Sequence, residues 1–135
     1  MFGIFKKNKA LTESLAIATT IAQTQILIGL PIDFYDSHFN TEFTNGYIFG
    51  LLQASYETTE KKDNQRKKLK HIENGYDVLF DNCSPIFFRS ALSSLNNSDE
   101  FQEGQHAGVR DFVEFKNKTL ARPTRLKNYL DTLAN

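Results

Sequence analysis

Hydrophobic residues recur every three or four positions along most of the chain, which is the spacing of an α-helix that buries one face. Between residues 11 and 28 two such stripes run side by side. One consists of Leu11, Leu15, Ala18, Ala22 and Ile26, and the other of Ile17, Ile21 and Ile28. A helix that is apolar on two sides is expected to be the central and most buried one.

The same spacing predicts further helices, and residues that favour helix starts mark their beginnings. The predicted N-caps, in chain order, are Asp36 or Asn40, Ser84 with Pro85 after it, and Ser98, and Pro123 opens a short last helix. No stretch alternates convincingly with period two, as a strand would. The sequence therefore predicts an all-α fold, a compact bundle of five to six helices that forms one domain over residues 1–135.

Two glycine pairs interrupt the predicted helices at a spacing of one turn. Gly46 and Gly50 lie in the second helix, and Gly104 and Gly108 lie in the fifth. Each glycine inside a helix costs roughly 1 kcal/mol relative to alanine, so close packing is expected to compensate. Three kinds of packing fit this pattern: a helix crossing within the chain, the seam of a homodimer, or a groove that holds a small apolar ligand.

The composition predicts a core rich in phenylalanine and a location in a reducing compartment. The chain has 12 Phe, 5 Tyr and no Trp, so phenylalanine is expected to supply much of the buried volume. A single cysteine, Cys83, excludes a disulfide within the chain and favours the cytoplasm. The apolar window 15–30 is too short and too polar to predict a membrane span. Residues 1–10 are interpreted as a mobile or partner-docking segment because large apolar side chains stand at the terminus.

Charges balance in number, at 16 basic against 16 acidic residues, but not in position. No Lys or Arg occurs between residues 10 and 60, whereas basic residues gather at 61–70 and 116–127. The predicted partner surface consists of Lys61, Lys62, Arg66, Lys67 and Lys70. Such clusters are solvated helix faces in most proteins, and nucleic-acid binding is a weaker hypothesis because 61–70 contains no aromatic residue.

Several residue pairs have a spacing that could support chemistry. His38 with Glu42, and Glu103 with His106, would together provide four metal ligands if they met in space. Cys83 is expected to be a small buried side chain rather than a nucleophile. The carboxylate pairs Asp77 with Asp81, and Asp111 with Glu114, are interpreted as surface charge. No nucleotide-binding or catalytic motif occurs, so no cofactor is expected and an enzyme is not favoured.

No resemblance to a known family is identified, and two classes of function remain. The first hypothesis is a cytoplasmic helical protein that acts through protein–protein contacts, as a homodimer or with another protein. The second is a bundle that binds a small apolar or aromatic ligand in a phenylalanine-lined cavity. In that case Tyr47, Tyr76 and His106 are the polar groups expected to orient the ligand.

Overall fold

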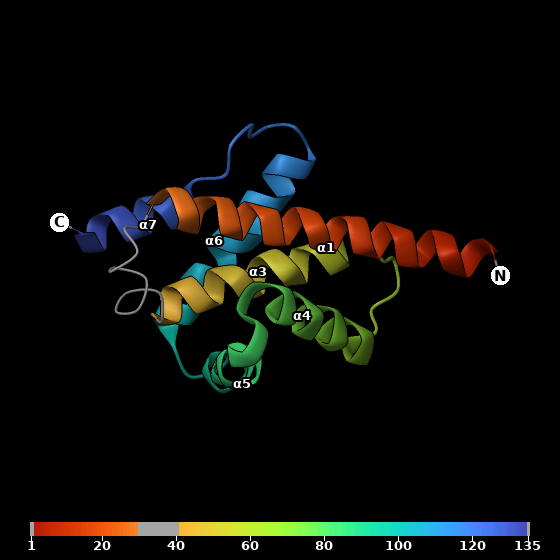
Figure 1. Ribbon diagram of the computed structural model, residues 1–135, viewed down its shortest axis with the longest axis horizontal. Helices are drawn as coiled ribbons and strands as arrows, with labels where there is room; N and C mark the ends of the chain where they lie inside the picture. Colours follow the sequence, from red (N-terminus) through yellow and green to blue (C-terminus); the bar gives the residue numbers. More distant parts are fainter. Residues whose placement is uncertain (1, 30–40, 135) are drawn as a thin grey trace.

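The computed structural model describes the backbone of residues 2–29 and 41–134 and the side chains of residues 9–26 and 41–133. These residues form six α-helices and one short 3-10 helix, and no strand occurs among them (Figure 1). The elements are α1 (Phe2–Gly29), α3 (Glu42–Glu57), α4 (Gln65–Phe80), η1 (Asp81–Cys83), α5 (Ser84–Ser94), α6 (Asp99–Lys116) and α7 (Arg125–Ala134). The prediction of an all-α bundle is confirmed. Because α1 begins at Phe2, most of the predicted N-terminal segment 1–10 continues this helix.

Short polar side chains begin three of the helices. Thr41 caps α3 and Asn64 caps α4, each by accepting a hydrogen bond from a backbone N–H three residues later. Ser98 accepts from the N–H of Phe101 at 3.1 Å, which confirms the predicted cap of α6. Asp36 and Asn40 lie outside the described residues, and Thr41 takes the role predicted for one of them.

The prediction that Ser84 caps α5 is wrong. The 3-10 helix η1 leads directly into α5, so that Cys83 stands at the N-cap position without a side-chain hydrogen bond. Ser84 is buried, and its hydroxyl donates instead to the Asp77 carboxylate at 2.5 Å. Cys83 itself is exposed, not buried as predicted, because the η1 turn lies at the surface.

The central helix is α3 rather than α1. Twelve of its sixteen residues are buried, and it packs against α1, α4, α5 and α6. The prediction for residues 11–28 is wrong because their second apolar stripe is divided: Ile21 is buried in the core, but Ile17 lies at the surface. Ala18, Ala22 and Ile26 are buried, whereas Ile17 from the second stripe is 40 % exposed.

Backbones of α3 and α6 meet directly at the four glycines. A Cβ atom added to any of them would lie 2.0 or 2.1 Å from a backbone oxygen of the facing helix. The facing oxygens of Gly46, Gly50, Gly104 and Gly108 belong to Phe101, Gln105, Phe43 and Tyr47, respectively. Residue numbers rise together along both helices, so α3 and α6 run parallel. These glycines are therefore close-packing positions within one chain, and they are covered by it.

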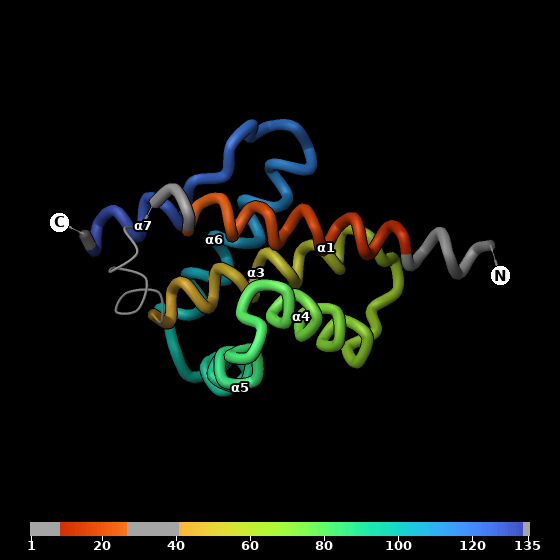
Figure 2. The backbone as a smooth tube through the Cα atoms, viewed as in Figure 1, coloured from red at the N-terminus to blue at the C-terminus, as the bar shows by residue number. Residues whose placement is uncertain are grey.

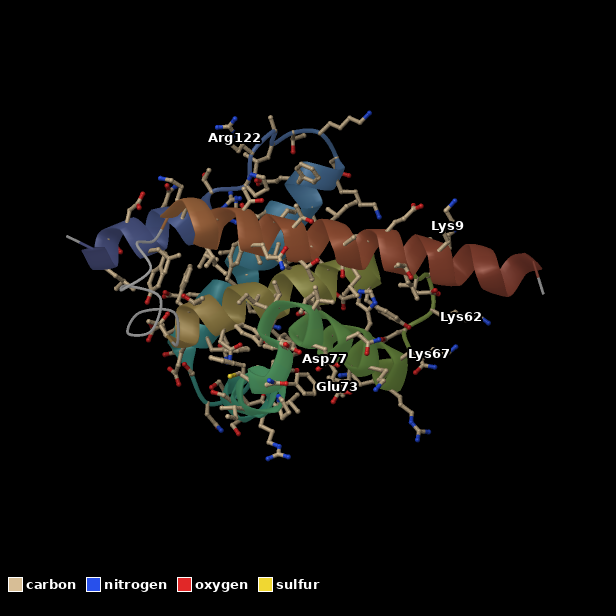
Figure 3. All side chains as sticks on the ribbon, viewed as in Figure 1. Lys9, Lys62, Lys67, Glu73, Asp77 and Arg122 are labelled. Atoms are coloured by element: carbon tan, nitrogen blue, oxygen red, sulfur yellow. The ribbon has the colours of Figure 1, made fainter. Side chains whose placement is uncertain are left out.

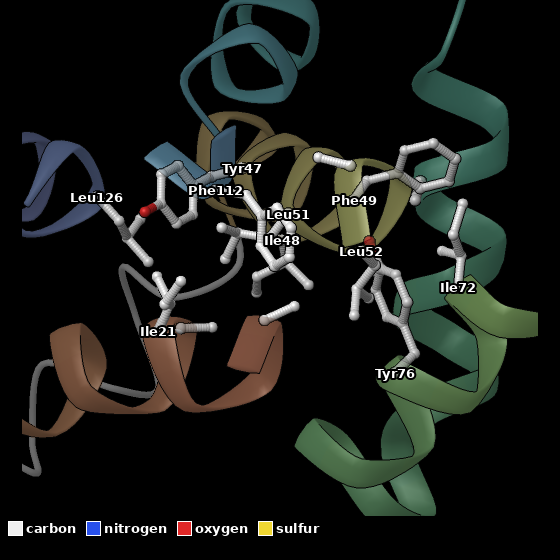
Figure 4. Packing of buried hydrophobic residues seen from close by; sticks show 14 of the residues in the cluster. Ile21, Tyr47, Ile48, Phe49, Leu51, Leu52, Ile72, Tyr76, Phe112 and Leu126 are labelled. Atoms are coloured by element: carbon white, nitrogen blue, oxygen red, sulfur yellow. The ribbon is translucent and has the colours of Figure 1, made fainter. Parts of the chain in front are cut away.

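Leucine, isoleucine and tyrosine contribute as much to the core as phenylalanine does (Figure 4). Of the described phenylalanines only Phe49, Phe101 and Phe112 are buried. Others lie at the border of the core, where Phe80 stacks on Phe87 with ring centroids 4.3 Å apart. Phenylalanine therefore supplies part of the buried volume, with three rings inside the core and five more packed against it.

Candidate functional site

A buried hydrogen-bond network joins α1, α3, α6 and α7 through Tyr47. The Tyr47 hydroxyl donates to the Asp111 carboxylate at 2.6 Å and accepts from the Gln25 side-chain amide at 2.7 Å. Asp111 is fully buried and forms an ion pair with the Arg125 guanidinium. Burial, with a smaller contribution from Asp111, raises the pKa of Tyr47 well above its ordinary value of 10.0. The interpretation of Asp111 as surface charge is wrong, since α7 supplies a cation to it.

Glu114 extends this network to the protein surface. Its carboxylate accepts a hydrogen bond from Arg125 at 2.8 Å, and this bond lowers the pKa of Glu114. Arg125 therefore bridges a buried and a partly exposed carboxylate. The arrangement places two carboxyl groups against one permanent cation, which is the geometry of a structural clamp.

Two smaller polar clusters fasten α4 to α3. The Tyr76 hydroxyl donates to the Asn45 side-chain oxygen at 2.6 Å, and burial raises the pKa of Tyr76. The Ser55 hydroxyl donates to the Leu52 carbonyl at 2.6 Å and lies 2.8 Å from His71 Nε2. Because the Ser55 proton is already donated, His71 must supply the hydrogen of the second bond. His71 is thus not positioned as a base that activates Ser55.

The predicted ligand-orienting residues do not converge on one cavity. Tyr47 and Tyr76 are fully buried and use their hydroxyls within the fold, while His106 lies exposed on α6. Every buried side-chain nitrogen or oxygen among the described residues has a hydrogen-bond partner. The described interior therefore offers no unpaired polar group to a ligand.

The predicted metal ligands are also dispersed. His38 lies outside the described residues, and Glu103 and His106 are exposed on α6. The Glu42 carboxylate accepts a hydrogen bond from the Ser98 hydroxyl at 2.5 Å. No group of three or more His, Cys, Asp or Glu side chains gathers in the part of the chain that the structure describes.

An apolar groove runs along the outer side of α1, between this helix and the connection from α6 to α7. Its two adjoining parts have volumes of about 600 and about 380 Å³. Both parts are lined by Ile17, Phe115 and Ala121. Glu13, Lys116 and Lys118 line one part of the groove, together with Ala10. Arg122 lines the other part, together with Thr24. Figure 2 shows this connection on the side of the molecule opposite to α4 and α5.

The outer face of α1 beside this groove has no charge for three turns. From residue 14 to residue 26 its exposed residues are Ala16, Ile17, Thr20, Gln23 and Thr24. Arg122 and Glu13 make no ion pair with any described residue, so each could accept a partner from outside the chain. This uncharged face and its groove are the site that sequence reasoning missed. The absence of charge over residues 14–26 was visible in the sequence. The sequence did not show that the connection from α6 to α7 lies beside this stretch and forms a groove with it.

The predicted basic partner surface lies at the start of α4 and in the turn before it. Lys61, Lys62, Arg66, Lys67 and Lys70 are all exposed. Lys62 and Lys67 extend outward at the end of the molecule where Lys9 also lies (Figure 3). Of the second basic cluster, Lys116 lies near them, since its ammonium donates to the Thr58 carbonyl at 3.3 Å, but the other members diverge. Arg122 lies on a different side in Figure 3, and Arg125 and Lys127 form ion pairs within the chain.

Comparisons of the chain with protein-family models, with curated proteins and with solved structures find no match. No helix in the described part of the chain has the length and apolar character needed to cross a membrane. The function must therefore be argued from the surfaces of this chain alone.

Proposed function

We propose that this protein acts through protein–protein contacts as a homodimer whose subunits join along the outer face of α1. The observation that carries this proposal is the uncharged face of α1 next to an apolar groove. Ile17 is 40 % exposed at the middle of this face, where a free monomer would leave it in water. A second copy of the chain would cover both the helix face and the groove.

The positions of Glu13 and Arg122 at opposite ends of the groove favour a second copy packed antiparallel. A two-fold axis near Ile17 makes the α1 helices of the two subunits run in opposite directions. Each end of the groove in one subunit then meets the opposite end of the groove in the partner subunit. Arg122 of the partner subunit then lies at the height of Glu13, and the same pair forms again across the axis. Thr20 and Ala16 near the axis are small enough to let the two helices approach closely.

The proposed location is the cytoplasm. The exposed, unpaired thiol of Cys83 fits a reducing compartment, where such groups persist without forming disulfides. Homodimer formation leaves α4 free to contact another protein, because α4 lies on the side of the molecule opposite to the connection from α6 to α7 (Figure 1).

Light scattering across a concentration series tests the dimer. We expect the native protein to have twice the monomer mass, and Ile17→Asp to give the monomer mass, because the seam would bury an unpaired carboxylate. Ile86→Asp is the matched control, since Ile86 is 68 % exposed on α5, away from the seam. A native protein that is monomeric at all concentrations would refute the proposal.

A charge exchange tests the orientation of the two subunits. Glu13→Arg and Arg122→Glu should each weaken the dimer, because each places like charges opposite one another. The double variant restores both pairs across the axis and should recover much of the lost association. Failure of this recovery, with a dimer still present in the native protein, would rule out the antiparallel arrangement.

Binding of a small apolar molecule in the same groove is the second candidate. It is favoured by Phe112 and Phe115 in the groove wall, and by a volume within the roughly 300–1,000 Å³ of ligand sites. A monomeric protein that enhances the fluorescence of anilinonaphthalene sulfonate, and loses this property on Phe115→Asp, would favour this candidate over the dimer.

A further inference from the structure

Residues of α4 and α5 line a second groove. These two helices lie on the side of the molecule opposite to the connection from α6 to α7 (Figure 1). It has a volume of about 430 Å³. Its apolar residues are Leu69, Phe88 and Leu92, and its charged residues are Arg66, Lys67, Lys70 and Glu73. An apolar floor with a mainly basic rim is a different kind of surface from the uncharged face of α1.

The positive charge of this rim is not neutralised within the described residues. Lys70 forms an ion pair with Glu73 at 3.1 Å, which leaves Arg66 and Lys67 without an acidic partner in the described chain. Lys68 next to them is by contrast paired with Glu57 at 3.1 Å. The side chains that line the groove therefore carry a net positive charge, and an acidic binding partner would complement it.

Arg66 and Lys67 also lie at the N-terminal end of a helix, where acidic residues are the favourable ones. They belong to the first turn of α4, and this turn contains no acidic residue. The helix dipole places positive potential at this end, so basic residues there are unfavourable when no anion is present. A carboxylate from outside would be attracted by the side chains and by the helix end together.

The floor of the groove requires more than a negative charge. Leu92 is 40 % exposed, and the half-buried ring of Phe88 lies beside it on the next turn of α5. A phosphate backbone would leave these apolar groups uncovered. An amphipathic helix covers such a floor with its apolar side chains and places its acidic ones on the rim.

We infer that the groove between α4 and α5 binds an acidic amphipathic helix of a partner protein. Apolar residues of that helix at positions i and i+4 would contact Leu69, Phe88 and Leu92, and its acidic residues would pair with Arg66 and Lys67. This inference does not depend on the proposed dimer, because the groove is complete within one chain. It assigns the second interaction surface to another protein rather than to a second copy.

A synthetic peptide tests the inference by nuclear magnetic resonance. The probe is a helix of about 18 residues with leucine on one face and glutamate on the other, long enough to form when stabilised by contact. Its addition to the ¹⁵N-labelled protein at low salt should shift the amide signals of Leu69, Phe88 and Leu92. The same titration of Ile17→Asp separates this result from any effect of subunit association. Absence of these shifts in both proteins would overturn the inference.

Two variants and two matched controls identify the contributing groups. Arg66→Glu combined with Lys67→Glu should lower the affinity at least about tenfold, and acids in this helix turn favour folding. Lys118→Glu reverses one charge at an exposed site in the groove beside α1 and should leave the affinity unaltered. Leu92→Ser should weaken binding of the amphipathic peptide. A permuted peptide of the same composition, without an apolar face, should bind less tightly than the original.

Other ligand classes give distinguishable results. Equal affinity for the permuted peptide would mean that charge alone is recognised, and the inference would be wrong. Tighter binding of anionic lipid vesicles or of duplex DNA through Arg66 and Lys67 would likewise overturn it in favour of a membrane or nucleic-acid surface.

Discussion

Among the single residues of this protein, His71 has the environment with the clearest consequence for pH. Its ring is buried between α3 and α4, bonded to Ser55 and 5.6 Å from the ring of Tyr56. Burial lowers the pKa of His71 below its ordinary value of 6.5 because the charged ring would lose its water. The neutral form is the one that the fold accommodates.

Stability should therefore fall as the solution is made mildly acidic. Below about pH 6.5 the unfolded chain binds a proton at this histidine before the folded chain does, so the free energy of unfolding decreases. Urea unfolding at about pH 7.5 and about pH 5.5 measures this difference, above the range in which carboxylates titrate. His71→Gln should reduce the pH dependence, and His106→Gln, at an exposed site, should retain it. An equal midpoint at both pH values in the native protein would contradict the prediction.

At the scale of elements, the parallel contact of α3 with α6 governs how the bundle packs. The two helices approach until backbone touches backbone, and only glycine permits this distance. Such an approach brings the helix surfaces into extensive contact and offsets the roughly 1 kcal/mol that each glycine costs within a helix.

Two alanine substitutions distinguish this contact from an ordinary helical glycine. In Gly50→Ala the new Cβ would lie 2.1 Å from the Gln105 backbone oxygen, so the helices must separate. We expect a loss of about 1–3 kcal/mol, despite the better helix propensity of alanine. In Gly75→Ala the Cβ would meet the end of the Leu52 side chain at 2.3 Å, which can rotate away. Chemical denaturation should show the smaller loss there, and equal losses would refute the distinction.

At the scale of the whole molecule, the network around Tyr47 connects four helices that are distant in sequence. Gln25 accepts from the Lys127 backbone N–H at 2.9 Å, so one side chain joins α1 to α7. Arg125 closes the network by pairing with Asp111 from α6. The network positions α7 beside α1 and thereby supports the connection that forms the wall of the groove.

Removal of a single hydroxyl from this network should lower global stability. Tyr47→Phe removes the shortest hydrogen bond of Gln25 Nε2 and of Asp111 Oδ2 and leaves them the longer ones to the Ile21 carbonyl and the Arg125 N–H, at a cost of about 1–3 kcal/mol. Tyr129→Phe removes an exposed hydroxyl that donates to Glu100 at 2.9 Å, and it serves as the control with a smaller effect. Thermal unfolding at one fixed protein concentration compares the two. A Tyr47→Phe variant as stable as the control would show that the network contributes little.

The predictions made from sequence succeeded where the signal is local. Helical spacing gave the all-α class, and Ser98 caps α6 because a cap depends on residues within one turn. The cap predicted at Ser84 failed because η1 continues into α5 and the Asp77 carboxylate accepts the serine hydroxyl. Ser98 stands one residue before α6, whereas Ser84 is already the first residue of α5, because the turn of residues 81–83 joins α4 to α5 directly.

Sequence by itself determined the helices, the helical spacing of the glycines, the charge-free stretch of α1 and the basic start of α4, because each depends on neighbouring residues. Tertiary structure decided that the two glycine pairs face each other and that Asp111 is buried beside Arg125. It also decided that Ile17 remains exposed beside residues 115–123. These outcomes depend on which helices become neighbours, and that choice is made by the packing of the whole chain.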